Sequence, residues 1–132
     1  MASIFSKIVS GEIPCYKVYE NAHFLAFLDI HPLAKGHTLV IPKTETDYLF
    51  DLEDQRLADM IIFSKKVAIG IKKAVECKRI GVAVIGLEVP HAHIHLVPIN
   101  GINDLNFSNP KLKLDNAEFN VIADNISQNI SE

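Results

Sequence analysis

Three histidines occupy alternate positions in one short run, at His91, His93 and His95. Side chains two positions apart in a β-strand project from the same face, so a strand here would place the three imidazoles on one surface. The intervening Ala92 and Ile94 would then face an apolar layer. On a helix, residues two apart point in widely different directions. We therefore predict a strand with one buried face and one face that lines a pocket.

Clustered imidazoles suit chemistry near neutral pH, because the histidine pKa is about 6.5 and the ring can serve as nucleophile, acid or base. Three histidines can also hold a catalytic zinc ion. A solvated polar face without a task is a third interpretation, although exposed strand faces usually carry other polar residue types. The residues alone leave nucleophilic or acid-base chemistry and metal binding open.

The elements that must position the histidines follow from apolar spacing and turn residues. The pattern predicts strands over 16–20, 24–28, 37–41, 81–85 and 93–98, a long amphipathic helix from 54 to about 77, and short helices over 3–10 and from 115 to about 126. This gives an α+β fold, a five-stranded antiparallel sheet with one long and a few short helices packed on one face. The loop over 100–110 is interpreted as an ordinary surface loop, with a position over a pocket mouth as the alternative.

Composition predicts one globular domain over residues 1–132. The 13 basic residues against 16 acidic ones give a net charge of −3 without a basic run, which argues against a nucleic-acid partner. No apolar run is long enough for a membrane span and no secretory signal is recognisable, so we expect no membrane partner and a cytoplasmic location. Cys15 and Cys77 form no Cys-X-X-Cys unit and are expected to be reduced thiols.

The run from His91 to Val97 resembles the signature of the histidine triad (HIT) superfamily, in which three histidines alternate with apolar residues. Similar segments follow in the expected order at 3–14, 26–32 and 36–43, which gives a matched core over about 3–99 before a C-terminal loop and short helix over about 100–132. The pattern is most similar to the compact Hint-like branch of nucleotide hydrolases and transferases. This resemblance implies a purine nucleotide substrate and a homodimer whose sheet continues across the two subunits.

The resemblance also implies roles for individual residues. In the family, the middle histidine attacks the α-phosphorus and becomes a nucleotidyl-histidine, and here that residue is His93. His95 would donate a proton to phosphate oxygens or to the leaving group, and the carbonyl of His91 would orient the nucleophile. His37 would approach the triad from a neighbouring strand. Asp29 would accept hydrogen bonds from the ribose hydroxyls.

Apolar residues near the N-terminus and at the end of the second strand would form the nucleobase slot in such a protein. They are Ile4, Phe5, Ile8, Phe27 and Ile30. A flat apolar slot implies loose base choice with a preference for purines, which offer more stacking area. His23 and His31 match no catalytic position, and we interpret both as surface residues.

The segment before the triad, Val84 to Val89, departs from the Hint-like pattern by a shorter link without the usual Asn. Gly86 can still offer a backbone amide to phosphate. An ionised Glu88 would repel phosphate unless it turns away, contacts an amine or a metal-shielded part of the substrate, or is protonated. This departure supports a second hypothesis, a nucleotide-binding module with little catalysis. A histidine-ligated metal enzyme is a third.

Some family members hold zinc with Cys-X-X-Cys and a later histidine, whereas Ser3, Ser6 and Glu45 stand at those places here. We therefore expect no bound metal and no required cofactor, although Mg²⁺ could accompany a polyphosphate through its own oxygens. The leading hypothesis is a HIT-type phosphoramidase or dinucleoside polyphosphate hydrolase that attacks the α-phosphate through a nucleotidyl-histidine intermediate. No basic cluster is present for a long polyphosphate, which favours phosphoramidates.

Overall fold

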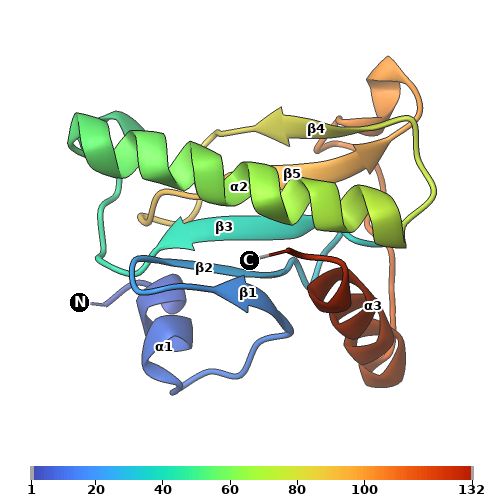
Figure 1. Cartoon of the computed structure of the whole chain (residues 1–132), viewed down its shortest axis with the longest axis horizontal. Coiled ribbons are helices and arrows are strands. Elements are labelled where there is room, and N and C mark those ends of the chain that lie inside the picture. The colour runs from blue at the N-terminus through green and yellow to red at the C-terminus, as the bar shows by residue number, and fades with distance from the viewer. Residues whose placement is uncertain (1, 132) are drawn as a thin grey trace.

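The centre of the molecule is a five-stranded antiparallel sheet, which we describe from a computed structural model of residues 2–131 (Figure 1). The strand order is β1-β2-β3-β5-β4. The strands are β1 (Lys17–Glu20), β2 (Phe24–Leu28), β3 (Thr38–Pro42), β4 (Arg79–Ala83) and β5 (Ile94–Ile99). The predicted α+β class with five antiparallel strands is confirmed.

Three α-helices and two 3₁₀ turns surround the sheet within residues 2–131. They are α1 (Ile4–Ser10), η1 (Leu49–Asp51), α2 (Asp54–Ala74), η2 (Ile102–Asp104) and α3 (Asn116–Gln128). The helix α1 begins after Ser3, whose side chain accepts a hydrogen bond from the amide of Ser6, and it ends at Gly11 in the left-handed region. Over the described residues, no helix combines the length and apolar character that crossing a membrane requires. The cytoplasmic location stays a prediction.

The two faces of the sheet carry two separate apolar clusters. One face packs against α2 and α3 through Phe24, Ala26, Val40, Ile94, Met60, Phe63 and Phe119. The other face carries a smaller cluster of Phe5, Leu25, Phe27, Leu39 and Ile41. The prediction that all helices pack on one face is therefore wrong for α1, which brings Phe5 to the second cluster. The strands β2 and β3 are buried along their whole length, because both of their faces are covered.

The histidine run differs from the prediction in one respect. The strand β5 begins at Ile94, and therefore only His95 of the three histidines lies within a strand. His91 and His93 precede it in an irregular segment, although Ala92 and Ile94 still point into the cluster under α2. The alternation of faces extends back beyond the ladder of hydrogen bonds. The segment can therefore use its main chain for contacts other than strand pairing.

Candidate active site

His93 is oriented by the main chain of a neighbouring residue. Its Nδ1 lies 2.8 Å from the carbonyl oxygen of His91. A carbonyl oxygen can only accept, so Nδ1 of His93 carries the proton and donates it to this bond. In the neutral ring, Nε2 then keeps its lone pair. The residue is 8% exposed, which leaves a small part of the side chain accessible.

The ring of His91 is buried and held from both sides. Its Nε2 donates to the carbonyl oxygen of Pro42 at 2.8 Å, and its Nδ1 accepts from the hydroxyl of Ser3 at 2.8 Å. Burial lowers the pKa of His91, which favours the neutral ring that these two partners require. The carbonyl that orients His93 thus belongs to a fixed residue.

The hydroxyl of Ser3 belongs to a hydrogen-bonded group at the start of α1. Glu45 Oε1 accepts from the amide of Ser3 at 2.6 Å and from the hydroxyl of Ser6 at 2.7 Å. These hydrogen bonds lower the pKa of Glu45 to about 2. Serine hydroxyls are poor zinc ligands, and the Nδ1 lone pair of His91 is already used by Ser3. The group therefore does not fit the zinc site found in part of the resembled family.

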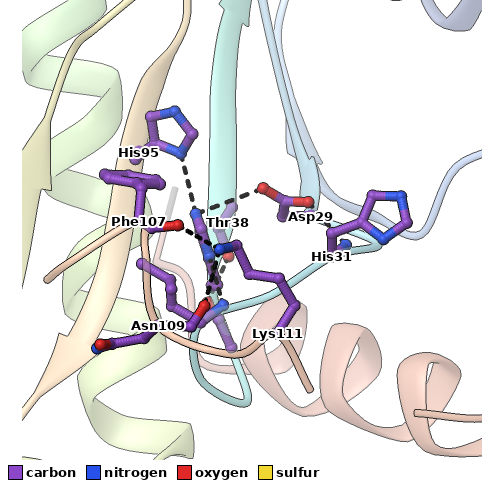
Figure 2. Close-up of polar contacts among 10 residues, drawn as sticks. Asp29, His31, Thr38, His95, Phe107, Asn109 and Lys111 are labelled. Atoms are coloured by element: carbon purple, nitrogen blue, oxygen red, sulfur yellow. Dashed lines mark hydrogen bonds and ion pairs between the residues drawn. The ribbon is translucent and has the colours of Figure 1, made fainter. Parts of the chain in front are cut away.

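A second chain of hydrogen bonds fixes the protons of His37 and His95 (Figure 2). The amide of Leu33 donates to Nδ1 of His37 at 3.0 Å, so the proton of the neutral His37 ring is on Nε2. This Nε2 donates to Nδ1 of His95 at 3.0 Å. Because Nδ1 of His95 accepts this bond, the single proton of the neutral His95 ring is on its Nε2. Burial is the largest cause that lowers the pKa of His37 to about 3 and that of His95 to about 4.

Asp29 lies beside this pair at the end of β2. Its Oδ2 is 3.6 Å from Nε2 of His37, and its Oδ1 accepts from the amide of His31 at 2.8 Å (Figure 2). Burial raises the pKa of Asp29. Ligand atoms of Asp29, His37 and His95 lie within 4.8 Å of one another, a spacing that a metal ion could use. However, the bond from Leu33 occupies the only lone pair of neutral His37, which favours a chain of protons over a metal.

Aromatic side chains form a wall on the other side of His93. The ring of Phe5 is 5.1 Å from the ring of His93 and 5.6 Å from that of Phe27, with an edge-to-face arrangement in each pair. Ile8 packs against the same cluster. Ile4 and Ile30, the other two residues expected in a nucleobase slot, are 51% and 59% exposed. The structure thus brings Phe5, Phe27 and Ile8 together.

The remaining site residues from the sequence lie at the surface. Gly86 has a φ of 76°, in the left-handed region, and Glu88 is exposed in the bend that follows. Exposure of Glu88 is compatible with a carboxylate turned toward water. His23 and His31 are exposed, which confirms their interpretation as surface residues.

The arrangement places a lone pair next to a proton donor. The rings of His93 and His95 are 4.9 Å apart, with Nε2 of the first unprotonated and Nε2 of the second protonated. A nucleophile beside a hydrogen-bond donor suits a displacement at phosphorus, because the donor can stabilise negative charge that develops on a phosphate oxygen or on the leaving group. His95 is neutral, since burial lowers its pKa to about 4, so its hydrogen bond does not depend on a positively charged ring.

Comparison with known proteins decides the family. The family model described as the HIT domain matches residues 10–101. The chain belongs to the HIT family. Among its relatives, the adenosine 5'-monophosphoramidase of Schizosaccharomyces pombe is 44% identical over 100 residues, which cover 74% of each protein. An uncharacterized HIT-like protein of Borreliella burgdorferi is 36% identical and covers 96% of this chain and 97% of its own.

Solved structures of HIT proteins have the same fold. A HIT-like protein from Bartonella henselae is 32% identical, with a TM-score of 0.85 and coverage of 97% of this chain and 96% of its own. A zinc-bound histidine triad family protein from Mycobacterium smegmatis is 30% identical, with a TM-score of 0.81 and coverage of 97% and 95%.

Several contacts of the site were not identified from the sequence. Ser3 and Glu45 were noted only as residues that stand where some relatives have zinc ligands, although they support His91 by hydrogen bonds. The spacing of Ser3 and Ser6 at a helix start could have indicated a cap. The contributions of Leu33 and Pro42 come from main-chain atoms and leave no signal in the residue type.

Proposed function

We propose that this HIT protein hydrolyses nucleoside 5'-phosphoramidates, compounds in which an amine is joined to the α-phosphate of a purine nucleotide. The observation that carries the proposal is the order of protons, with a free lone pair on Nε2 of His93 beside a protonated Nε2 of His95. The name of the Schizosaccharomyces pombe relative, an adenosine 5'-monophosphoramidase, supports this substrate class.

The reaction proceeds in two displacements. Nε2 of His93 forms a bond to the α-phosphorus while the phosphorus–nitrogen bond breaks and its electron pair goes to the amine. The departing nitrogen accepts a hydrogen bond from Nε2 of His95 and takes a proton from solvent to leave as a neutral amine, and the hydrogen bond from His37 keeps the His95 proton on Nε2. Water then attacks the nucleotidyl-histidine, the bond between phosphorus and Nε2 of His93 breaks, and the proton of the water goes to solvent. Nucleotide is released and His93 regains its lone pair.

The substrate would lie between the aromatic wall and Asp29. Phe5, Phe27 and Ile8 offer an apolar surface for a purine ring, with Ile4 and Ile30 at its exposed rim. Asp29 would accept hydrogen bonds from the ribose hydroxyls, and the amide of Gly86 would face the phosphate. A dinucleoside polyphosphate, whose leaving group departs as an anion, makes less use of the proton on His95 and is the second substrate class.

The direct test is the release of adenosine monophosphate from adenosine 5'-phosphoramidate and, separately, from diadenosine tetraphosphate. His93→Ala should lose about a thousandfold or more of the activity. His23→Ala removes an exposed histidine outside the site and should keep wild-type activity. Equal activity in wild-type protein and His93→Ala would contradict the proposal.

The position of Glu88, three residues before His91, supports one other candidate, a nucleotide-binding module with little catalysis. A carboxylate near the phosphate would destabilise an anionic transition state more than it would weaken the binding of a nucleoside. Titration calorimetry with adenosine monophosphate would then detect binding while neither substrate is turned over. A Glu88→Gln variant that gains activity would identify the carboxylate as the cause.

We also propose a homodimer joined along β4 and α2. The strand β4 lies at one edge of the sheet, and the exposed apolar residues Ile61, Ile62, Ile69, Val82, Val84, Ile85 and Leu87 lie on or near these two elements (Figure 1). A second copy would cover this surface and satisfy the open strand edge. Sedimentation should give a dimer for the wild type, and Val82→Asp should give a monomer. A wild-type monomer at micromolar concentration would contradict the proposal.

A further inference from the structure

The loop between β5 and α3 returns to the histidine site in the same chain. The ring of Phe107 is 4.7 Å from the ring of His95 and 6.2 Å from that of His37, with interplanar angles of 66° in both pairs. Figure 2 shows the Phe107 ring directly against His95. The interpretation of 100–110 as an ordinary surface loop is therefore wrong at this position.

Phe107 is held by hydrogen bonds on both sides of it in the loop. The amide of Asn109 donates to the carbonyl of Asn106 at 3.0 Å, and the side chain of Asn109 donates to the carbonyl of Asn103 at 2.7 Å. The ammonium group of Lys111 donates to the carbonyls of Phe107 and of Asn109 (Figure 2). A loop with this many internal bonds presents its aromatic ring in a defined position.

The loop is also tied to the segment that organises His37. The amide of Leu112 donates to the carbonyl of Pro32 at 2.9 Å. Pro32 precedes Leu33, whose amide fixes the proton of His37. The loop that carries Phe107 is therefore joined by a hydrogen bond to the segment that orients His37.

The order of protons in the pair requires both rings to stay neutral. A second proton on Nδ1 of His95 would meet the proton that His37 donates there, and the hydrogen bond would be lost. The charged and titratable groups that face the pair are Asp29, 3.6 Å from Nε2 of His37, the neighbouring ring of His93 and the ammonium group of Lys111. The carboxylate of Asp29 favours a positive charge on the neighbouring histidines. Exclusion of water must therefore oppose that charge if the rings are to stay neutral.

We propose that Phe107 is a positioning residue that excludes water from the hydrogen bond between His37 and His95 and thereby keeps the proton of His95 on Nε2. The half-buried ring packs against the rings of both His95 and His37. Phe107 contacts His95, the hydrogen-bond donor of the site, and we assign Phe107 no contact with the reacting atoms. Its effect on catalysis rests on the proposed function, whereas its effect on the histidine pair does not.

The test is an NMR titration of the histidine side chains in full-length protein labelled with ¹⁵N. In the wild type, His95 should keep its Nε2 proton and remain neutral down to about pH 5, since burial lowers its pKa to about 4. In Phe107→Ala, water reaches the pair, and the midpoint should rise by about one pH unit or more toward the ordinary value of about 6.5. Phe107→Leu keeps an apolar cover and should retain most of the wild-type behaviour.

The matched control is Ile102→Ala, which removes an apolar side chain that is 92% exposed in the same region of the chain. It should titrate as the wild type does. An unchanged midpoint in folded Phe107→Ala, or an equal rise in Ile102→Ala, would overturn the proposal. These spectra need no substrate, so a failure of the proposed hydrolysis is distinguishable from a failure of this inference. If both proposals hold, kcat begins to fall at a higher pH in Phe107→Ala than in the wild type as the pH is lowered. KM stays within about twofold.

Discussion

Nδ1 of His93 donates a 2.8 Å hydrogen bond to the main-chain carbonyl of His91. The first histidine of the triad therefore positions the second through its backbone, while its own ring is engaged with Ser3 and Pro42. The rings of the triad are not interchangeable. One offers a lone pair, one anchors the segment, and His95 holds a proton.

A His91→Ala variant should therefore be less damaging than loss of the nucleophile. The carbonyl of residue 91 remains, but the segment loses the anchors to Ser3 and Pro42 and can shift. We expect activity to fall by up to about a hundredfold, the cost of a misplacement of about 1 Å, and the protein to lose stability because buried partners are left unpaired. Kinetics and urea unfolding measure both effects. A loss as complete as in His93→Ala would show that the ring itself takes part in the reaction.

Replacement of His95 by Ala should affect substrates according to their leaving groups. A departing amine nitrogen depends on the hydrogen bond from Nε2 of His95, and loss of such a donor costs about a hundredfold to a thousandfold. A nitrophenyl ester of adenosine monophosphate releases a stable anion and should lose much less. The ratio of kcat/KM for the two substrates, compared between wild type and variant, tests this assignment. Equal losses for both would indicate that His95 acts on the phosphate and not on the leaving group.

Acid should destabilise the protein through the buried histidine pair. Burial lowers the pKa of His37 to about 3 and that of His95 to about 4, whereas both titrate near 6.5 in the unfolded chain. Above about pH 6.5 the rings are neutral in both states and stability is fully present. As the pH falls further, the unfolded state binds protons that the folded state does not, and each ring removes up to about 1.4 kcal/mol per pH unit.

Urea unfolding between pH 7.5 and pH 5 measures this dependence. His95→Asn should show a weaker slope, and His23→Ala should keep the wild-type slope because that histidine is exposed. A free energy of unfolding that stays constant over this range would contradict the buried neutral pair.

Chelators should leave the hydrolysis of a phosphoramidate unchanged. The group of Ser3, Ser6 and Glu45 does not fit zinc, and His37 has no free lone pair for a metal. Protein purified without a polyhistidine tag should contain less than about a tenth of an equivalent of zinc by elemental analysis. Activity lost with EDTA and restored by zinc would support the histidine-ligated metal enzyme instead.

The sequence predicted the alternation of residues around the site better than the tertiary contacts that join them. Alternation around Ala92 and Ile94 correctly separated the histidine side from the core under α2. The start of β5 was placed too early, because side-chain alternation continues where strand pairing has not begun. Contacts such as Ser3 with Glu45 and Phe107 with His95 depend on tertiary arrangement, and no local pattern encodes them.

In the proposed reaction, Nε2 of His93 forms a covalent bond to the α-phosphorus. The most direct measurement is the intact mass of the protein after brief mixing with adenosine 5'-phosphoramidate, with acid-labile adducts preserved. We expect the mass to increase by one adenylyl group in the wild type and in His23→Ala, and we expect no adduct in His93→Ala. Turnover without any adduct in the wild type, or the same adduct in His93→Ala, would contradict it.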